Sequence, residues 1–397
     1  MSLRLSFIVC TLLLAGCNIY VTSFPTAPAP SPSVEAVEDT EVPPTPFPDT
    51  PAPPAIAAPV IDSPALIDIQ FFNELDGWGL TESFILRTND GGITWYSVTP
   101  PDIEDMSSGV ETFILDQDHA WVQKPDFNNF PNNGLLYHTA DGGLTWNISS
   151  TPFSSGDLSF IDDERGWMMA DLGAAAGSNA VAVFQTEDGG TTWTQTYTND
   201  PNLPDAGDSL PLGGIKSELM PRDMQTAWVG GNIYSPGTIY LYRTDDGGHT
   251  WSLVDLELPA DAENFELGID RDQMQFVSKN DGFLVMRMSG DFTQTAVYVT
   301  NDGGDTWTLT PTLIPNAGES DFLSAEEAII YNGEQFYVTR DAARTWATVS
   351  PDIVFGDSFA SMDFVSPETG WIISAVDEQR SLYRTNDGGV TWLPVVP

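Results

Sequence analysis

From residue 65 onward, short apolar stretches alternate with turn-forming residues along the chain. Residues 67–99 illustrate the pattern, with the four segments IDIQFF, GWGLT, SFILRT and TWYSVT separated by turn-formers such as NELD and NDGG. Such short runs of alternating or continuous apolar residues are typical of β-strands. After the first 16 residues, no apolar spacing predicts an amphipathic helix of useful length. The pattern therefore predicts an all-β fold.

A nine-residue motif joins the third and fourth of these segments and recurs along the chain. Its seven copies are RTNDGGITW (87–95), HTADGGLTW (138–146), QTEDGGTTW (185–193), RTDDGGHTW (243–251), VTNDGGDTW (299–307), VTRDAARTW (338–346) and RTNDGGVTW (384–392). Each copy has a Thr two residues before an Asp, a Thr four residues after it and a Trp five residues after it. The Asp and Trp residues are Asp90, Asp141, Asp188, Asp246, Asp302, Asp341, Asp387, Trp95, Trp146, Trp193, Trp251, Trp307, Trp346 and Trp392.

A second position, aromatic in six of the seven repeats, precedes each motif. It is occupied by Trp78, Trp121, Trp167, Trp228, Phe283, Ile329 and Trp371, each after a Gly or Ala. Seven residues earlier lie Phe71, Ile114, Phe160, Pro221, Phe276, Phe322 and Phe364. All 12 tryptophans of the chain fall into these two repeated positions, as core residues do in a modular fold.

Four strands repeated with a period of 39 to 58 residues are typical of a propeller blade. We therefore predict a seven-bladed β-propeller over residues 65–397, with four antiparallel strands per blade. The first repeat begins with its own inner strand and the last ends with its own outer strand, so we expect blade packing to close the ring without an exchanged strand.

The repeated motif is interpreted as a structural turn. Gly91 and Gly92 allow a tight reversal, and Asp90 can accept hydrogen bonds from backbone N–H groups and a Thr hydroxyl. A calcium loop is the alternative, but Ca²⁺ takes about six to eight oxygens and each motif has one invariantly placed carboxylate. The sixth copy, RDAART, lacks both glycines, and we expect it to be the most distorted turn.

The N-terminus predicts a membrane anchor. Residues 1–16 contain Arg4 and a twelve-residue apolar run that ends in Leu14-Ala15-Gly16-Cys17, which resembles a bacterial lipoprotein signal whose removal leaves a lipid on Cys17. Residues 17–64 are then a tether, since 13 of the 40 residues from Pro25 to Pro64 are prolines. An extracytoplasmic location at the cell surface, in the periplasm or in a thylakoid lumen follows. The only other cysteine, Cys10, lies inside the signal.

Charge narrows the choice of partner. The chain has 57 acidic residues against 14 Lys and Arg, a net charge of -43. A surface this negative repels nucleic acid phosphates. A basic or membrane protein, or an envelope glycan, fits better as the partner of a monomeric protein, although acidity also serves solubility.

No catalytic motif stands out in the sequence. The arginines in the motif, Arg87, Arg243 and Arg384, belong to different blades, so they do not form the arginine cluster of a sialidase. A glycosidase using two carboxylates stays open because the separation of the acids is unknown. The histidines His119, His138 and His249 lie in or beside repeat elements of different blades, so we expect neither a metal site nor a cofactor.

The loops on the face opposite the repeated turns are the predicted ligand surface. They include residues 123–134, 172–180, 199–214 and 288–295, which we expect to be long and irregular. The candidate ligand residues are Asp102, Glu104, Asp105, Asp205, Asp208, Asp261, Glu263, Glu266, Phe127 and Tyr234, with Phe265 as a further exposed aromatic. An acidic surface with scattered aromatic residues suits a basic protein segment, a cation or a sugar.

The motif T-x-D-G-G-x-T-W resembles the Asp-box (BNR-type) repeat of sialidases and sortilin-type receptors. With seven units and the upstream Gly-Trp, the chain most resembles the propeller family of photosystem II assembly and stability factors. That resemblance implies a non-enzymatic assembly role and a membrane-protein partner engaged through a basic surface, whereas this chain is acidic. Two functions remain: a protein-binding or assembly scaffold and, alternatively, a glycoside hydrolase or other glycan-active enzyme.

Overall fold

A computed structural model describes residues 56–106, 109–316, 318–377 and 379–396. The predicted signal, Cys17 and all of the tether before residue 56 lie outside these residues. The described part is nearly all β-structure, with only two short 3-10 helices, η1 (Ala262–Asn264) and η2 (Gly356–Ser358). No helix within it is long and apolar enough to span a membrane. The all-β prediction is confirmed.

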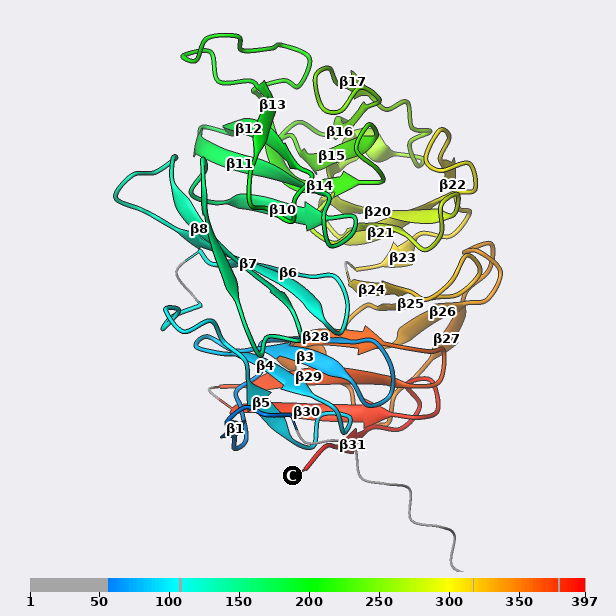
Figure 1. Cartoon of the computed structure of the whole chain (residues 1–397). Coiled ribbons are helices and arrows are strands. Elements are labelled where there is room, and N and C mark those ends of the chain that lie inside the picture. Colours follow the sequence, from blue (N-terminus) through cyan, green and yellow to red (C-terminus); the bar gives the residue numbers. More distant parts are fainter. Residues whose placement is uncertain (1–55, 107–108, 317, 378, 397) are drawn as a thin grey trace, which may run out of the picture. The chain divides into compact units, whose positions relative to one another are not determined.

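Seven units of antiparallel strands, one for each Asp-box, follow one another along the chain (Figure 1). The fourth and fifth units are joined into one hydrogen-bonded sheet through Asn232 and Gly268. Blade 1 contains β2 (Asp68–Phe71), β3 (Gly77–Leu80), β4 (Ile85–Thr88) and β5 (Trp95–Ser97). Blade 2 contains β6 (Glu111–Ile114), β7 (His119–Pro125), β8 (Gly134–Ala140) and β9 (Asn147–Thr151). Blade 3 contains β10 (Gly156–Phe160), β11 (Gly166–Ala175), β12 (Ser178–Thr186) and β13 (Thr194–Thr198).

The remaining blades keep this order, with a modified fifth blade. Blade 4 contains β14 (Ile215–Pro221), β15 (Ala227–Asn232), β16 (Ile239–Thr244) and β17 (Ser252–Leu253). Blade 5 contains β18 (Glu266–Gly268), β19 (Met274–Phe276), β20 (Gly282–Ser289), β21 (Thr293–Thr300), β22 (Thr308–Leu309) and β23 (Ile314–Pro315). Blade 6 contains β24 (Glu319–Phe322), β25 (Ala328–Tyr331), β26 (Phe336–Thr339) and β27 (Ala347–Val349). Blade 7 contains β28 (Phe359–Phe364), β29 (Gly370–Val376), β30 (Gln379–Thr385) and β31 (Leu393–Pro394).

The inner strand of blade 5 is interrupted. β18 and β19 pair with opposite ends of β20, through Gly268 with Arg287 and through Met274 with Leu284. Five residues therefore lie between the two pairing segments, opposite only two residues of β20. A segment with extra residues must leave the ladder, and here it carries Arg271 and Asp272.

An additional strand lies on the outer edge of blade 1. β1 (Val60–Ile61) pairs with β5 through Val60 with Tyr96 and Ile61 with Trp95. The last residues of the segment interpreted as a tether are therefore part of the propeller sheet, and they cover an otherwise open strand edge.

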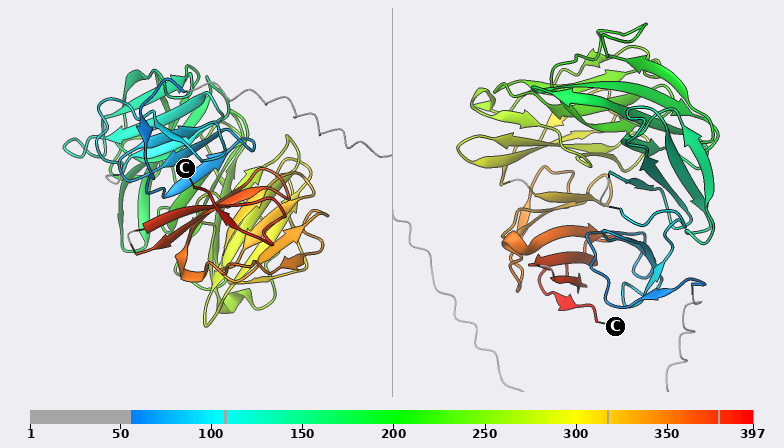
Figure 2. Two further views of the ribbon diagram at one scale, coloured as in Figure 1. Left: turned by 90° about the horizontal axis from the view of Figure 1, so that it is seen from below. Right: turned by 90° about the vertical axis from the view of Figure 1, so that its left-hand side faces the viewer.

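Blade packing closes the ring, as expected from the sequence. Blade 1 uses only strands β2 to β5 with the added β1, and blade 7 uses only β28 to β31. The first and last blades lie side by side (Figure 2). Phe71 of blade 1 stacks on Trp371 of blade 7 with ring centroids 3.8 Å apart. No strand crosses between these two blades in the described residues.

The upstream aromatic residues form the core between blades. Trp78, Trp121, Trp167, Trp228 and Trp371 have no exposed surface. Several of their indole nitrogens donate to a carbonyl of the next blade, such as Trp121 Nε1 to Gly189 O at 3.0 Å and Trp371 Nε1 to Gly91 O at 3.1 Å. The interpretation of this position as core is confirmed.

The Asp-box turns have the predicted hydrogen bonds. In the first box, the Thr94 N–H and the Thr88 hydroxyl donate to Asp90 Oδ1 at 2.8 and 2.9 Å. The expectation of a distorted sixth box was wrong. Thr345 N donates to Asp341 Oδ1 at 2.9 Å as in the other boxes, and Ala342 and Ala343 adopt the positive φ angles of 56° and 58° that glycine supplies elsewhere.

Two of the predicted irregular loops are mostly extended hairpins. Residues 172–180 belong largely to β11 and β12, which turn at residues 176 and 177. Residues 288–295 belong largely to β20 and β21. These four strands have 10, 9, 8 and 8 residues and are longer than the strands of the other blades.

Candidate functional site

Strand direction assigns each loop to one of two faces of the propeller. Because the strands of a blade alternate in direction, the Asp-box turns and the turns before the Gly-Trp elements share one face. The starts of the inner strands and the hairpins between the second and third strands share the other, which we call the loop face. The Asp-box turns and the predicted ligand loops therefore lie on opposite faces, as the sequence predicts.

The ten candidate ligand residues of the loop face are all exposed. Tyr234 and Phe127 are 64% and 62% exposed, and their rings lie over Gly177 and Gly109 of neighbouring loops. The structure therefore links these two aromatic residues to adjacent loops but does not gather all ten residues into one pocket. Phe265 is buried and packs edge-on against Phe292, so its expected exposure was wrong.

A set of carboxylates on the inner strands was missed in the sequence. Five of the seven repeats carry an acid three residues before the position that Phe71 occupies in the first repeat. These acids are Asp68, Glu111, Asp157, Glu218 and Glu319. Their pairing partners occupy equivalent positions, as in Asp68 with Leu80 and Glu111 with Gln123. The acids therefore lie at the same level of each blade, toward the loop face.

Several carboxylates of the inner strands join neighbouring blades. Glu319 Oε2 and Asp321 Oδ2 accept the backbone N–H groups of Met362 and Phe364 in blade 7, at 2.9 and 3.0 Å. Asp157 Oδ2 accepts the N–H of Leu219 in blade 4 in the same way. Backbone N–H groups on the open edge of one inner strand thus donate to carboxylates on the inner strand of the preceding blade. These hydrogen bonds stabilise the ring.

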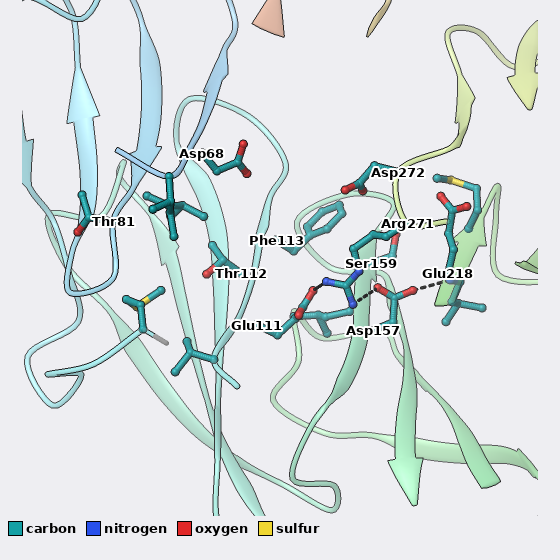
Figure 3. Close-up of a pocket in the computed structure, with 17 residues that line it drawn as sticks. Asp68, Thr81, Glu111, Thr112, Phe113, Asp157, Ser159, Glu218, Arg271 and Asp272 are labelled. Carbon is teal, nitrogen blue, oxygen red and sulfur yellow. Dashed lines mark hydrogen bonds and ion pairs between the residues drawn. The ribbon is translucent and has the colours of Figure 1, made fainter. Parts of the chain in front are cut away.

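Arg271 reaches from the interruption in blade 5 toward blades 2 and 3 (Figure 3). Its guanidinium forms ion pairs with Glu111 and with Asp157, the latter at 3.1 Å between Nη2 and Oδ1. The side chain of Arg271 is 45% exposed, whereas that of Glu111 is 18% exposed. The bulge between β18 and β19 allows this reach, because a residue in a regular inner strand would remain in its own blade.

Burial raises the pKa of Glu111, Asp157 and Glu218 around Arg271. The pKa of Glu111 rises to about 7 and that of Asp157 to about 6, with Arg271 opposing the effect of burial in both. The pKa of Glu218 is raised well above its usual value by burial and by the nearby Asp157 and Asp272. In blade 6, burial and the nearby Asp68 raise the pKa of Glu319 to about 8.

These groups line two adjoining cavities at the centre of the ring. One has a volume of about 320 Å³ and is lined by Asp68, Glu111, Asp157, Glu218 and Asp272 together with Arg271. The other, of about 660 Å³, shares Asp68, Arg271 and Asp272 and extends to Glu319, Asp321 and Asp363. Among the described residues, no group of three or more His, Cys, Asp or Glu side chains is arranged to hold a metal ion.

Two arginines and one histidine at the rim pack against core tryptophans. Arg384 lies 5.0 Å from the Trp371 ring centroid and pairs with Glu74 of blade 1 at 2.8 Å. Arg243 likewise lies over Trp228 and pairs with Asp305 of blade 5. His138 stacks on Trp121 at 4.5 Å.

The seven Asp-boxes and the closed ring define a BNR-type β-propeller. A profile of the family described as "Photosynthesis system II assembly factor YCF48" matches residues 56–199. Among curated proteins, a xyloglucanase of Paenibacillus sp is 22% identical over 77% of this chain, and one of Hypocrea jecorina (strain QM6a) is 24% identical over 54%. The chain spans only 26% and 29% of the length of these two enzymes.

Solved structures of both kinds share the fold. YCF48 bound to D1 peptide has a TM-score of 0.50 and 17% identity, covering 83% of this chain and 95% of that chain. YCF48 from Cyanidioschyzon merolae has a TM-score of 0.51 and 16% identity, covering 83% and 98%. The GH74 xyloglucanase from Xanthomonas campestris has a TM-score of 0.55 and 13% identity, covering 84% and 55%. Identities this low establish the fold alone.

Proposed function

We propose that this chain is a non-enzymatic binding propeller that assists the assembly of a protein partner outside the cytoplasm. A lipid on Cys17 would hold it at a membrane, and residues 18–55 would serve as the tether. The acidic loop face would contact a basic or membrane-protein partner. Opposite charge accelerates such encounters and selects among partners.

The observation that carries this proposal is that acids of the inner strands form hydrogen bonds to the next blade. A glycosidase places one carboxyl group on each side of the bond to be cleaved. Here Asp157, Glu319 and Asp321 accept backbone N–H groups of the next blade, which explains their presence without catalysis. The similarity to a peptide-bound YCF48 structure over 95% of that chain also supports a protein ligand.

Crosslinking in the native membrane tests the proposal. Full-length protein would be crosslinked and its captured proteins compared between two triple variants with equal charge changes. One carries Glu104→Gln, Glu263→Gln and Glu266→Gln on the loop face, and the control carries Glu164→Gln, Glu187→Gln and Glu326→Gln on the Asp-box face. All six side chains are exposed. We expect specific proteins to be captured by wild type and by the control, and to be lost with the loop-face variant.

Equal capture by the two triple variants, or no protein enriched over an acidic control protein of similar charge, would contradict the proposal. Detection of Cys17 lipidation by mass spectrometry tests the anchor separately. An unmodified Cys17 in protein isolated from its native membrane would exclude lipid anchoring while leaving the binding role in place.

A glycan-active hydrolase is the second candidate. Two xyloglucanases match the chain, and the central cavities hold carboxyl groups with raised pKa, as a general acid requires. The test is the release of new reducing ends from xyloglucan by the purified protein. Turnover that is abolished by Glu319→Gln and retained by Glu187→Gln would favour this function over binding alone.

A further inference from the structure

The cavity beside Arg271 contains more acidic groups than its one basic group can neutralise. Five acids line it, of which Glu111 and Asp157 form ion pairs with Arg271. Asp68 instead accepts a hydrogen bond from the Ser361 hydroxyl at 2.8 Å. Within the described residues, Glu218 and Asp272 form no ion pair.

Glu218 is also left with an unsatisfied oxygen. The residue is only 4% exposed. Its Oε1 accepts the N–H of Met274 at 3.3 Å, whereas its Oε2 is buried and has no hydrogen-bond partner. A buried carboxylate oxygen without a donor is unfavourable, so a donor that enters this cavity would remove the penalty.

The cavity has room for such a donor and an opening to solvent. Its volume is about 320 Å³, and the 45% exposure of the Arg271 side chain indicates access from outside. Figure 3 shows the Arg271 guanidinium between Glu111 and Asp157, with Glu218 on the same side as Asp157. Arg271 itself demonstrates that a guanidinium fits between carboxylates at this level of the ring.

We propose that this cavity binds a second cationic group next to Arg271, namely the guanidinium or ammonium of a basic side chain on a protein partner. The cation would bind between Glu218 and Asp272. This inference rests on the proposed function, because it names the chemistry by which the partner is held. A guanidinium satisfies the site best, since it has several donors in a planar arrangement that matches carboxylates.

Ionisation of the cavity supports the assignment. The groups facing the site are Asp68, Glu111, Asp157, Glu218 and Asp272, with Arg271 as the resident cation. Burial raises the pKa of all five acids, so part of this set is protonated near neutral pH. A bound cation favours the ionised forms and should release protons. Affinity should therefore increase as the pH rises from about 5.5 to about 8.

Calorimetric titration of the full-length protein with N-acetyl-arginine amide tests the site. N-acetyl-citrulline amide is the matched probe, since it has nearly the same shape without the charge. We expect the arginine probe to bind on the order of tenfold more tightly than the citrulline probe. Glu218→Gln keeps an acceptor for the Met274 N–H but cannot ionise when a cation binds, and should weaken arginine binding by a similar factor. Glu187→Gln, on the Asp-box face, should leave it unchanged.

Asp272→Asn provides a second variant in case Glu218→Gln fails to fold. Asp272 has a φ of 61°, a conformation that Asn also tolerates, and we expect a loss of affinity comparable to that of Glu218→Gln. Equal binding of the arginine and citrulline probes, or equal losses in Asp272→Asn and Glu187→Gln, would overturn the proposal. Arginine binding without any captured partner would instead refute the proposed function and leave the cation site standing.

Discussion

The Trp371 ring of the last blade stacks face to face on the Phe71 ring of the first, with centroids 3.8 Å apart and planes inclined by 4°. Asp363 Oδ2 accepts the Phe71 N–H at 2.5 Å beside this stack, and Trp371 Nε1 donates to Gly91 O. The same stack occurs within the ring between Trp121 and Phe160, at 3.7 Å and 8°. The closing interface is therefore built like an internal one.

Removing the closing stack should cost as much as removing an internal one. We expect Phe71→Ala and Phe160→Ala each to lower the free energy of unfolding by about 3–5 kcal/mol, the usual cost of deleting a buried aromatic ring. Urea denaturation followed by tryptophan fluorescence measures both. A loss below about 1 kcal/mol for Phe71→Ala, with a full loss for Phe160→Ala, would mean that the ring is not closed by this contact.

The central acids should make the propeller more stable at mildly acidic pH. Glu319 has a pKa of about 8 against 4.5 for an unperturbed Glu, so the folded state binds more protons between these values. The stability from this group is present below pH 4.5 and is lost as the pH rises through 8. Glu111 and Asp157 act in the same sense up to about pH 7 and pH 6. We expect the thermal midpoint to fall between pH 5 and pH 8.

Glu319→Gln is the variant that isolates this effect, because glutamine can still accept the Met362 N–H without titrating. Its thermal midpoint should depend less on pH than that of wild type, whereas Glu187→Gln should retain the wild-type dependence. A midpoint that increases from pH 5 to pH 8 in wild type would show that these carboxyl groups are not desolvated in the folded protein.

The Asp-box aspartates should be structural. Asp302 accepts hydrogen bonds from Thr306 N and Thr306 Oγ1 at 2.9 and 2.7 Å, and these bonds lower its pKa to about 2. Asp302→Ala should lower the free energy of unfolding by about 1–3 kcal/mol, since it leaves these donors without an acceptor. Asn301→Ala, at the exposed neighbouring position, should change it by less than about 0.5 kcal/mol. Chemical denaturation with and without added Ca²⁺ would also reveal any metal dependence.

The second glycine of the box should be indispensable in the fifth copy. Gly304 has a φ of 82°, and a Cβ there would lie 2.4 Å from the Trp228 ring. Gly304→Ala should therefore destabilise the fold by about 1–3 kcal/mol or more. In the sixth copy Ala343 occupies the same position and is buried without such a clash, so Ala343→Gly should have a much smaller effect. Similar thermal midpoints for the two variants would contradict this difference.

The repeat could be identified from the sequence because the hydrogen bonds of each Asp-box join residues that are close in sequence. Thr88, Asp90 and Thr94 lie within seven residues, and their hydrogen bonds depend on short-range backbone geometry. The same short range made the sixth box difficult to judge. Whether Ala342 and Ala343 could take positive φ angles depends on the packing around them, which the motif does not contain.

The acidic cavity could have been located only in part. A carboxylate in the same position of five repeats is visible once Phe71, Ile114, Phe160, Pro221 and Phe322 are aligned, and this periodicity is the signal that was missed. Arg271 has no such signal. Its ion pair with Glu111 joins residues 160 positions apart, and it depends on an interruption of the inner strand that no residue pattern announces.

The sequence by itself determined the blade, the number of blades and the positions of the core tryptophans, because these follow from periodic apolar residues and local turns. Only the tertiary structure decided that inner-strand acids of successive blades line adjoining central cavities, that Arg271 forms ion pairs with two of them, and that Glu218 retains an unsatisfied oxygen. The physical reason is that desolvation and charge pairing depend on distances across the ring, which arise only when all seven blades are packed together.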